Sequence, residues 1–264
     1  MLIGFGQPVG AATVDGGAAI NLGALTDGRP TSVARIHSDA GLVRLRLAWT
    51  APAEIRIAGL LGLSCAAGTP VRLVGRLAGQ DGFDVPLGGN SALQPVIALS
   101  DDSLAAWFIV DGGQALTGVQ FEVEASDFDA GELVAMPAVE IGHQIGWSME
   151  AVDPSVRERT LGSGLNVVAR RPYRVLRADM TPLRVAEVRA GGLGGGMDLD
   201  RLRHRLSGGR RVVAIPRWGA GTGVLDVAEL HATALYGQAA LGGATHLGGD
   251  YYGGAWTFEE SPPL

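Results

Sequence analysis

Residues 43–49, Val-Arg-Leu-Arg-Leu-Ala-Trp (VRLRLAW), decide how the first half of this sequence folds. Apolar side chains fall at every second position, and two arginines stand between them. This two-residue period is that of a β-strand with one buried side and one solvent-facing side. The segments EIRIAGLLGL (54–63) and PVRLVGRL (70–77) repeat the pattern. The sequence therefore predicts a sheet with an apolar inner face and an arginine-bearing outer face.

More runs of β-forming residues follow, separated by clusters of turn residues. They are PVIALS (95–100), AAWFIV (105–110), GVQFEVEA (118–125) and ELVAMPAVEIG (132–142). About seven short strands in some 100 residues are typical of a β-sandwich or jelly roll. We therefore expect a β-sandwich domain over residues 31–145.

The second half, residues 146–264, is expected to form another β-rich domain with one short helix. The helix is predicted over MDLDRLRHRL (197–206), where Leu199, Leu202 and Leu206 have helical spacing. The segment VAELHATALYG (227–237) fits either a helix or a strand. The fold class predicted for the chain is all-β with one short helix.

Residues 1–30 are expected to form an N-terminal arm. They include apolar residues such as Leu2, Ile3 and Phe5, yet 9 of the 30 positions are Gly or Pro and no amphipathic helix fits. We expect the arm to contact the second domain or an adjacent subunit, and to contribute more to assembly than to folding.

Composition excludes several functional classes. The chain has 264 residues, 47% of them hydrophobic, and all 21 basic residues are arginine, so lysine-dependent chemistry has no residue to use. The net charge of −6 disfavours binding to nucleic acid, which needs a basic surface. The N-terminus has no basic signal-peptide region and no long apolar run follows, so we expect synthesis in the cytoplasm and no membrane insertion.

No candidate catalytic or metal site is predicted. Ser163 has glycines directly beside it and Ser148 lacks the second glycine, so neither fits the nucleophile-elbow spacing, and His143 and Asp153 complete no triad. The pair His246 and Asp250 is a weak metal-binding hypothesis.

Two further features have ordinary structural interpretations. Asp127, Asp129 and Glu132 in DFDAGE have calcium-loop character but the wrong glycine spacing, which favours a turn. The lone Cys65 is expected to be a small buried residue. The sequence thus indicates no catalytic residue, no cofactor and no metal.

The order of several segments resembles that of virion structural proteins from long-tailed bacteriophages, which are minor tail or baseplate components. The segments are NLGALTDGRPTSVARI (21–36), residues 43–76, EIGHQIGWSMEAVDPSVRERTLGSG (140–164), RRVVAIPRW (210–218), ALYGQ (234–238) and AWTFEE (255–260). The first half is similar to a discoidin-type, galactose-binding-like jelly roll. Gly62, Leu63 and Ser64 stand where that family carries an asparagine-containing turn, which weakens any transfer of sugar contacts.

The resemblance implies a non-enzymatic structural subunit of a tail tip or baseplate, located in the virion and packed against hub, distal-tail or fibre proteins in several copies. A possible protein interface is the outward set of arginines: Arg44, Arg46, Arg56, Arg72 and Arg76. The alternative is a carbohydrate-binding module that recognises the host envelope. Its possible glycan contacts are Tyr251, Tyr252 and Trp256, for which core or interface packing is the competing interpretation.

Overall fold

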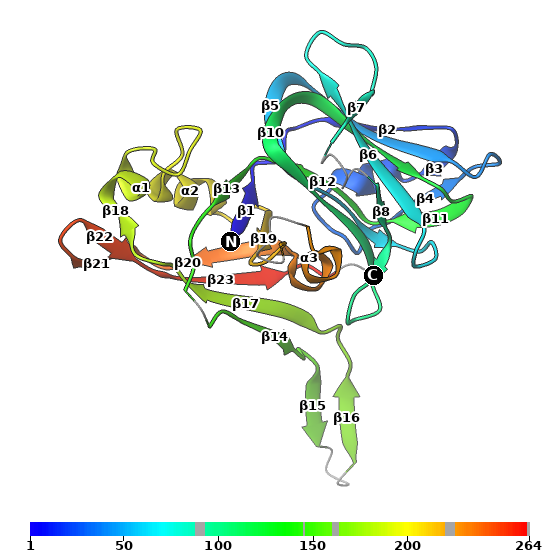
Figure 1. Cartoon of the computed structure of the whole chain (residues 1–264). Helices are drawn as coiled ribbons and strands as arrows, with labels where there is room; N and C mark the ends of the chain where they lie inside the picture. The colour runs from blue at the N-terminus through cyan, green and yellow to red at the C-terminus, as the bar shows by residue number, and fades with distance from the viewer. Residues whose placement is uncertain (88–92, 145, 160–163, 220–224, 263–264) are drawn as a thin grey trace.

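A computed structural model describes the chain except for residues 88–92, 145, 160–163, 220–224 and 263–264. Its first half is built around a large antiparallel sheet (Figure 1). The strands run in the order β12 (Glu132–Met136), β5 (Val43–Leu63), β10 (Leu104–Val123), β6 (Pro70–Leu77) and β7 (Val85–Pro86), with β2 (Ala11–Asp15) on β5, β8 (Leu93–Pro95) on β6 and β9 (Ile97–Ala98) on β10.

A smaller sheet and a 3₁₀ helix pack against the large sheet. The smaller sheet contains β11 (Asp127–Ala130), β4 (Ala34–His37) and β3 (Ala18–Ile20), and the 3₁₀ helix is η1 (Leu22–Thr26). Side chains from both sheets, including Ile36, Leu45, Phe121 and Phe128, form one buried core. The alternation seen at residues 43–49 places Val43, Leu45, Leu47 and Trp49 in this core, as predicted from their period of two.

The second half is built on another antiparallel sheet, which lies beside the sandwich (Figure 1). Its strands run in the order β13 (Ala138–Glu140), β1 (Leu2–Phe5), β19 (Val212–Ile215), β20 (Leu235–Leu241), β23 (Ala255–Glu260), β17 (Tyr173–Asp179) and β14 (Ser148–Val152). Two small sheets complete the described strands: β15 (Val156–Arg159) with β16 (Leu165–Val168), and β18 (Leu183–Arg184) with β22 (Tyr251–Gly253) and β21 (Thr245–Gly248). The all-β class is confirmed.

Strands β1 and β19 of the second sheet are buried on both faces. One face packs against the sandwich, where Leu2, Val213 and Tyr236 contact a cluster that includes Ile57 and Trp107. The other face packs against the helices α1 (Val185–Arg189) and α2 (Leu199–Leu206). Apolar layers therefore run continuously from the sandwich to the helices, and the two halves share buried surface.

Helix α2 is the helix predicted from the leucine spacing. Leu199, Leu202 and Leu206 are buried, and the Asp198 side chain accepts a hydrogen bond from the Arg201 backbone nitrogen at 2.8 Å. This is an ordinary N-cap, which satisfies a backbone donor at the helix start. The ambiguous segment at 227–237 divides into helix α3 (Val227–Thr233) and the start of β20. The described residues thus contain three short α-helices, where the sequence predicted one.

Residues 1–30 contact the second domain, as expected, but they do so as part of its sheet and not as a separate arm. Strand β1 lies inside the second sheet, paired with β13 on one side and β19 on the other, and all four of its residues are buried. Strand β2 pairs with β5 of the sandwich. The apolar run of β1 lacks a period of two because Leu2 faces the sandwich while Ile3 faces the helices.

Candidate interaction surfaces

A two-stranded hairpin, β15 and β16, projects from the body of the protein (Figure 1). Its described side chains include four exposed aliphatic ones: Val156 (41% exposed), Leu165 (61%), Val167 (47%) and Val168 (51%). Two-stranded hairpins are marginally stable alone in water and are usually covered by further strands or by another surface. Exposed aliphatic groups gathered on such an element indicate a contact site.

The two strands of the hairpin have different chemistry. β15 carries Arg157, Glu158 and Arg159, whereas β16 consists of Leu165, Asn166, Val167 and Val168. Cross-strand partners share a face of the hairpin. One face therefore combines Arg157 and Arg159 with Leu165 and Val167, and the charge of the hairpin is concentrated on β15.

Side chains fix the base of the hairpin. The Ser155 hydroxyl donates to the Arg170 carbonyl at 3.3 Å and accepts from the Arg170 backbone nitrogen at 2.9 Å. Asp153 accepts from the Ser155 backbone nitrogen at 2.9 Å and from the Arg157 guanidinium at 3.0 Å. These bonds join the chain entering β15 to the chain leaving β16.

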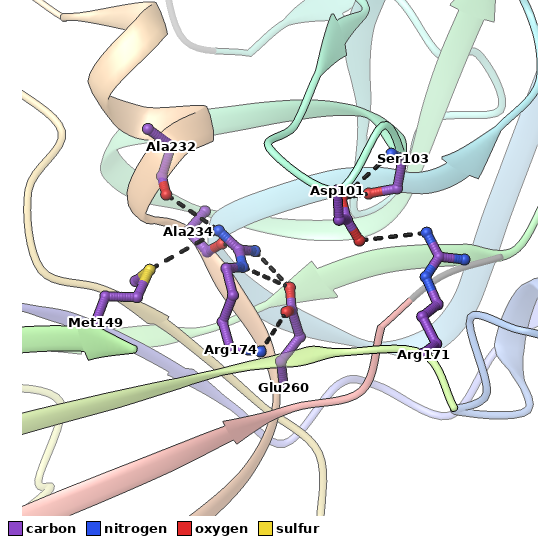
Figure 2. Close-up of polar contacts among 8 residues, drawn as sticks. All are labelled: Asp101, Ser103, Met149, Arg171, Arg174, Ala232, Ala234 and Glu260. Carbon is purple, nitrogen blue, oxygen red and sulfur yellow. Dashed lines mark hydrogen bonds and ion pairs between the residues drawn. The ribbon is translucent and has the colours of Figure 1, made fainter. Parts of the chain in front are cut away.

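Two arginines that follow β16 connect the hairpin to both halves of the molecule (Figure 2). Arg171 donates to Asp101, in the turn before β10, at 3.2 Å. Burial raises the pKa of the Asp101 carboxyl, but hydrogen bonds from Ser103 and the charge of Arg171 outweigh burial and lower it overall. The hairpin is thus joined to the sandwich through a charged aspartate.

Arg174 makes the second connection. Its Nε donates to Glu260 Oε1 at 2.9 Å, and its backbone nitrogen donates to Glu260 Oε2 at 2.9 Å. The same guanidinium donates to the carbonyls of Ala232 and Ala234 at the end of α3, as Figure 2 shows. Helix ends leave carbonyls unsatisfied, so Arg174 both pairs a buried carboxylate and caps a helix.

The predicted interface arginines are partly neutralised. Arg44 and Arg46 lie beside Asp15, Arg44 also pairs with Glu122 at 3.3 Å, and Arg72 lies 3.8 Å from the same glutamate. Arg56 lies beyond them on β5, and its Nε is buried without a hydrogen-bond partner among the described residues. The outer face of the sandwich therefore carries both arginine and acidic side chains, many of them paired.

A cleft of about 280 Å³ lies on this outer face. Its lining includes Thr13, Arg46, Arg76, Asp81 and Phe83. The guanidinium carbons of Arg46 and Arg76 lie 5.3 and 5.1 Å from the centre of the Phe83 ring, which is cation–π geometry. Two donors, a carboxylate and a hydroxyl make this a polar cleft with an aromatic wall.

The three candidate glycan contacts lie in different environments. Tyr251 is exposed, Tyr252 packs against His246 and Arg189, and Trp256 is only 2% exposed within the core beneath α2. The Trp256 ring therefore has no face free to stack on a sugar in this structure. The three residues do not form one exposed aromatic platform.

Those residues weighed for catalysis that the structure describes do not assemble into a site. His143 Nδ1 lies 3.1 Å from the backbone nitrogen of Met1, while Asp153 is used at the base of the hairpin. Ser163 is outside the described residues. His246 Nε2 lies 2.7 Å from the Gly249 carbonyl, and no cluster of three or more metal-ligating side chains occurs in the described part of the chain.

The three carboxylates of DFDAGE are separated in space. Asp127 pairs with His37 at 2.6 Å and Asp129 with Arg35 at 2.9 Å, whereas Glu132 is buried where the two sheets meet. They cannot form the calcium loop considered from the sequence. In the described residues, no helix has the length and apolar character needed to cross a membrane.

Sequence reasoning missed a pocket of about 420 Å³ at the junction of the two halves. Gln7, Asp27, Arg211, Tyr236 and Glu132 contribute to its lining. Glu132 is 1% exposed, and its Oε2 has no hydrogen-bond partner in the described part of the chain. Burial, aided by the charge of Asp27, raises the pKa of Glu132 to about 8, so this carboxyl is largely protonated at neutral pH.

The chain has a distant structural likeness to a known protein. No protein-family model and no curated protein matches the sequence. A solved structure, CpGH89CBM32-6 produced by Clostridium perfringens, matches 48% of this chain and 92% of that chain, with 11% sequence identity and a TM-score of 0.35. This is a weak likeness to a β-rich carbohydrate-binding module, and it is too distant to carry an argument about function.

Proposed function

We propose that this protein is a structural subunit of a phage tail tip, a baseplate or a related particle, and that it acts through packing against other subunits. The observation that carries the proposal is the projecting hairpin, whose base is tied to both halves while its aliphatic side chains are exposed. A monomer gains no core from this arrangement. In an assembly, the hairpin would present exposed aliphatic side chains to a neighbouring subunit from a fixed base.

Excision of the hairpin tests the proposal. Residues 156–168 would be replaced by a short Gly-Ser turn between Ser155 and Ala169, which leaves Asp153, Arg170, Arg171 and Arg174 in place. Particles would then be purified from the bacterium or phage that encodes the gene, and the subunit quantified by mass spectrometry. We expect a folded protein with an unchanged melting temperature that is depleted at least tenfold from particles.

The matched control removes apolar surface elsewhere. Leu247 and Tyr251 are also exposed, and Leu247→Ser with Tyr251→Ser should leave incorporation normal. Absence of the unaltered protein from every particle fraction would refute the proposal.

A second candidate function, glycan binding, is favoured by the cleft that contains Arg46, Arg76 and Phe83. Arginine donors beside a carboxylate can bind sugar hydroxyl groups. A glycan array with the purified chain tests this, with Arg76→Gln as the variant. Binding that disappears in the variant would support the second function, and an array without signal would leave only the structural one.

A further inference from the structure

The free edge of β16 differs from the free edge of β15. Exposed strand edges present unpaired backbone groups, and proteins protect them with charged side chains or proline. β15 is protected by Arg157, Glu158 and Arg159, whereas β16 has no charged residue and no proline. Of the two described strands of the hairpin, β16 is therefore the one with an unprotected edge.

The geometry points to a second copy of this chain as the occupant: we propose that two hairpins pair through their β16 edges into one four-stranded antiparallel sheet. This deepens the proposed structural role, because it rests on that role and names one partner. Symmetric dimers are the commonest assemblies of soluble proteins, and they require a surface that complements itself.

Register and charge select β16 for this pairing. In a dimer with a two-fold axis perpendicular to the sheet, the residue nearest the axis lies opposite the same residue of the second chain. Centred on Asn166, the pairing sets Leu165 opposite Val167 of the second copy. Centred on Val167, it sets the two Val167 side chains opposite each other. Both registers bring aliphatic groups together with no charge in opposition.

The same operation applied to β15 fails. Centred on Arg157 it places two arginines opposite each other, and centred on Glu158 it opposes two glutamates and also sets Arg157 against Arg159. Like charges directly opposite across a sheet are destabilising. In the β16 dimer these charged strands become the outer edges, where they protect the four-stranded sheet from adding further copies.

The body of the protein leaves room for this partner. The hairpin projects away from both main sheets (Figure 1), and all its described strand residues are exposed. A four-stranded sheet is also more stable in water than an isolated two-stranded hairpin, which is marginally stable. Because each strand has only four residues, we expect a weak dimer of the isolated chain, strengthened where an assembly holds two copies close together.

The test uses the full chain in sedimentation-velocity experiments over a concentration series. The unaltered protein should show a concentration-dependent monomer–dimer equilibrium. Val167→Arg places two arginines near the two-fold axis and should weaken the dimer about tenfold or more. The control Val9→Arg changes an apolar residue that is 97% exposed and lies outside the hairpin, so it should dimerise normally.

A mixing experiment separates loss of pairing from loss of folding. Val167→Arg and Val167→Glu should each be monomeric, and an equimolar mixture should recover the dimer because opposite charges then lie on the same face close to the two-fold axis. Disulfide trapping reports the register: Asn166→Cys or Val167→Cys should crosslink with its own copy under oxidation, and Arg157→Cys should not.

A chain that stays monomeric at every concentration, or a dimer that is indifferent to Val167→Arg, would overturn the inference. The proposed structural role has its own test, because particle incorporation that depends on the hairpin would survive either result. Hairpin-dependent capture of a different subunit, without a dimer of this chain, would likewise overturn the pairing and leave the structural role standing.

Discussion

Glu132 shows how a single residue couples the junction of the two halves to pH. Its carboxyl is buried at the meeting of two sheets, beside Tyr236 and near Asp27. Burial raises the pKa of Glu132 to about 8 and also raises the pKa of Tyr236. The folded protein therefore holds a proton on Glu132 at pH values where the unfolded chain, with an ordinary glutamate, has lost it.

The sign of the effect follows from proton binding. Between about pH 4.5 and pH 8 the folded state binds more protons at Glu132 than the unfolded state does. The contribution of Glu132 to the unfolding free energy therefore decreases as pH rises through that range. Glu132→Gln keeps the shape and removes the titration. We expect the variant to exceed the unaltered protein in unfolding free energy by roughly 2 to 5 kcal/mol at pH 8, and by far less at pH 4.5. Urea denaturation at the two pH values measures this, and an equal difference at both would contradict it.

His231 has the opposite pH dependence. Its Nε2 accepts from the Trp107 backbone nitrogen at 3.0 Å, and its Nδ1 lies 2.8 Å from the Val227 carbonyl, so the neutral ring joins α3 to β10. Burial lowers the pKa of His231 below its ordinary value of 6.5. The unfolded chain binds the proton first, so stability should fall as pH drops below about 6.5. His231→Gln should flatten that fall in thermal melts between pH 7 and pH 5.

At the scale of elements, the ion pair Arg174–Glu260 joins β17, β23 and α3. The side chains are 14% and 5% exposed, and the guanidinium also satisfies two carbonyls at the end of α3. Removing one member of a buried pair leaves an uncompensated charge, which is strongly destabilising. The strand that continues from the hairpin therefore depends on this arginine for its position.

We expect Arg174→Met to lower the unfolding free energy by about 3 to 5 kcal/mol. Arg177→Met is the matched control on the same strand, because the pair of Arg177 with Glu150 is half exposed and should contribute about 1 kcal/mol or less. Chemical denaturation of both variants gives the comparison. Equal losses would show that burial of the Arg174 pair adds nothing.

The elements that could be predicted from sequence are those with a clear period. The strand at 43–49 and helix α2 each bury a single face, so their apolar residues recur at every second position in the strand and at every third or fourth position in the helix. Strand β1 escaped prediction because it is buried on both faces. The run that begins at Leu165 does indicate a strand, but β15 and its pairing with β16 escaped prediction because both faces of the hairpin are exposed.

The contact sites were harder to predict because they depend on distant partners. The alternation correctly sends the side chains of Arg44, Arg46 and Arg72 away from the core, yet it contains no information about Asp15 and Glu122, which come from other strands. Tyr251 and Trp256 are five positions apart in the sequence, but Tyr251 lies at the surface and Trp256 lies in the core. The junction pocket around Glu132 combines segments from both ends of the chain.

At the scale of the whole molecule, strand β1 makes the two halves one structure. Leu2 packs in the layer shared with the sandwich, and Ile3 packs in the layer shared with the helices. We expect Leu2→Ala with Ile3→Ala to lower the unfolding free energy by about 4 to 10 kcal/mol, since each large-to-small change in a core costs about 2 to 5 kcal/mol. Val9→Ala, at an exposed position, should change it by less than about 0.5 kcal/mol.

The double variant should still unfold in one transition. Tryptophan fluorescence and far-UV circular dichroism would follow the two halves together, because the layer between them is common to both. Two separated transitions would show that the halves unfold independently. A negligible loss of stability would show that residues 1–30 contribute little to folding, as expected of an assembly arm.

The position of β1 also sets the order of events during protein synthesis. Residues 2–5 are synthesised well before their two neighbours in the sheet, which are residues 138–140 and 212–215. The second of these pairings cannot form until residues 212–215 have emerged from the ribosome, so one edge of this apolar strand stays unpaired while more than 200 residues are added. Pairing across such sequence distances makes folding slow and leaves intermediates prone to aggregation. Chaperone binding to residues 2–5 during translation is the expected consequence.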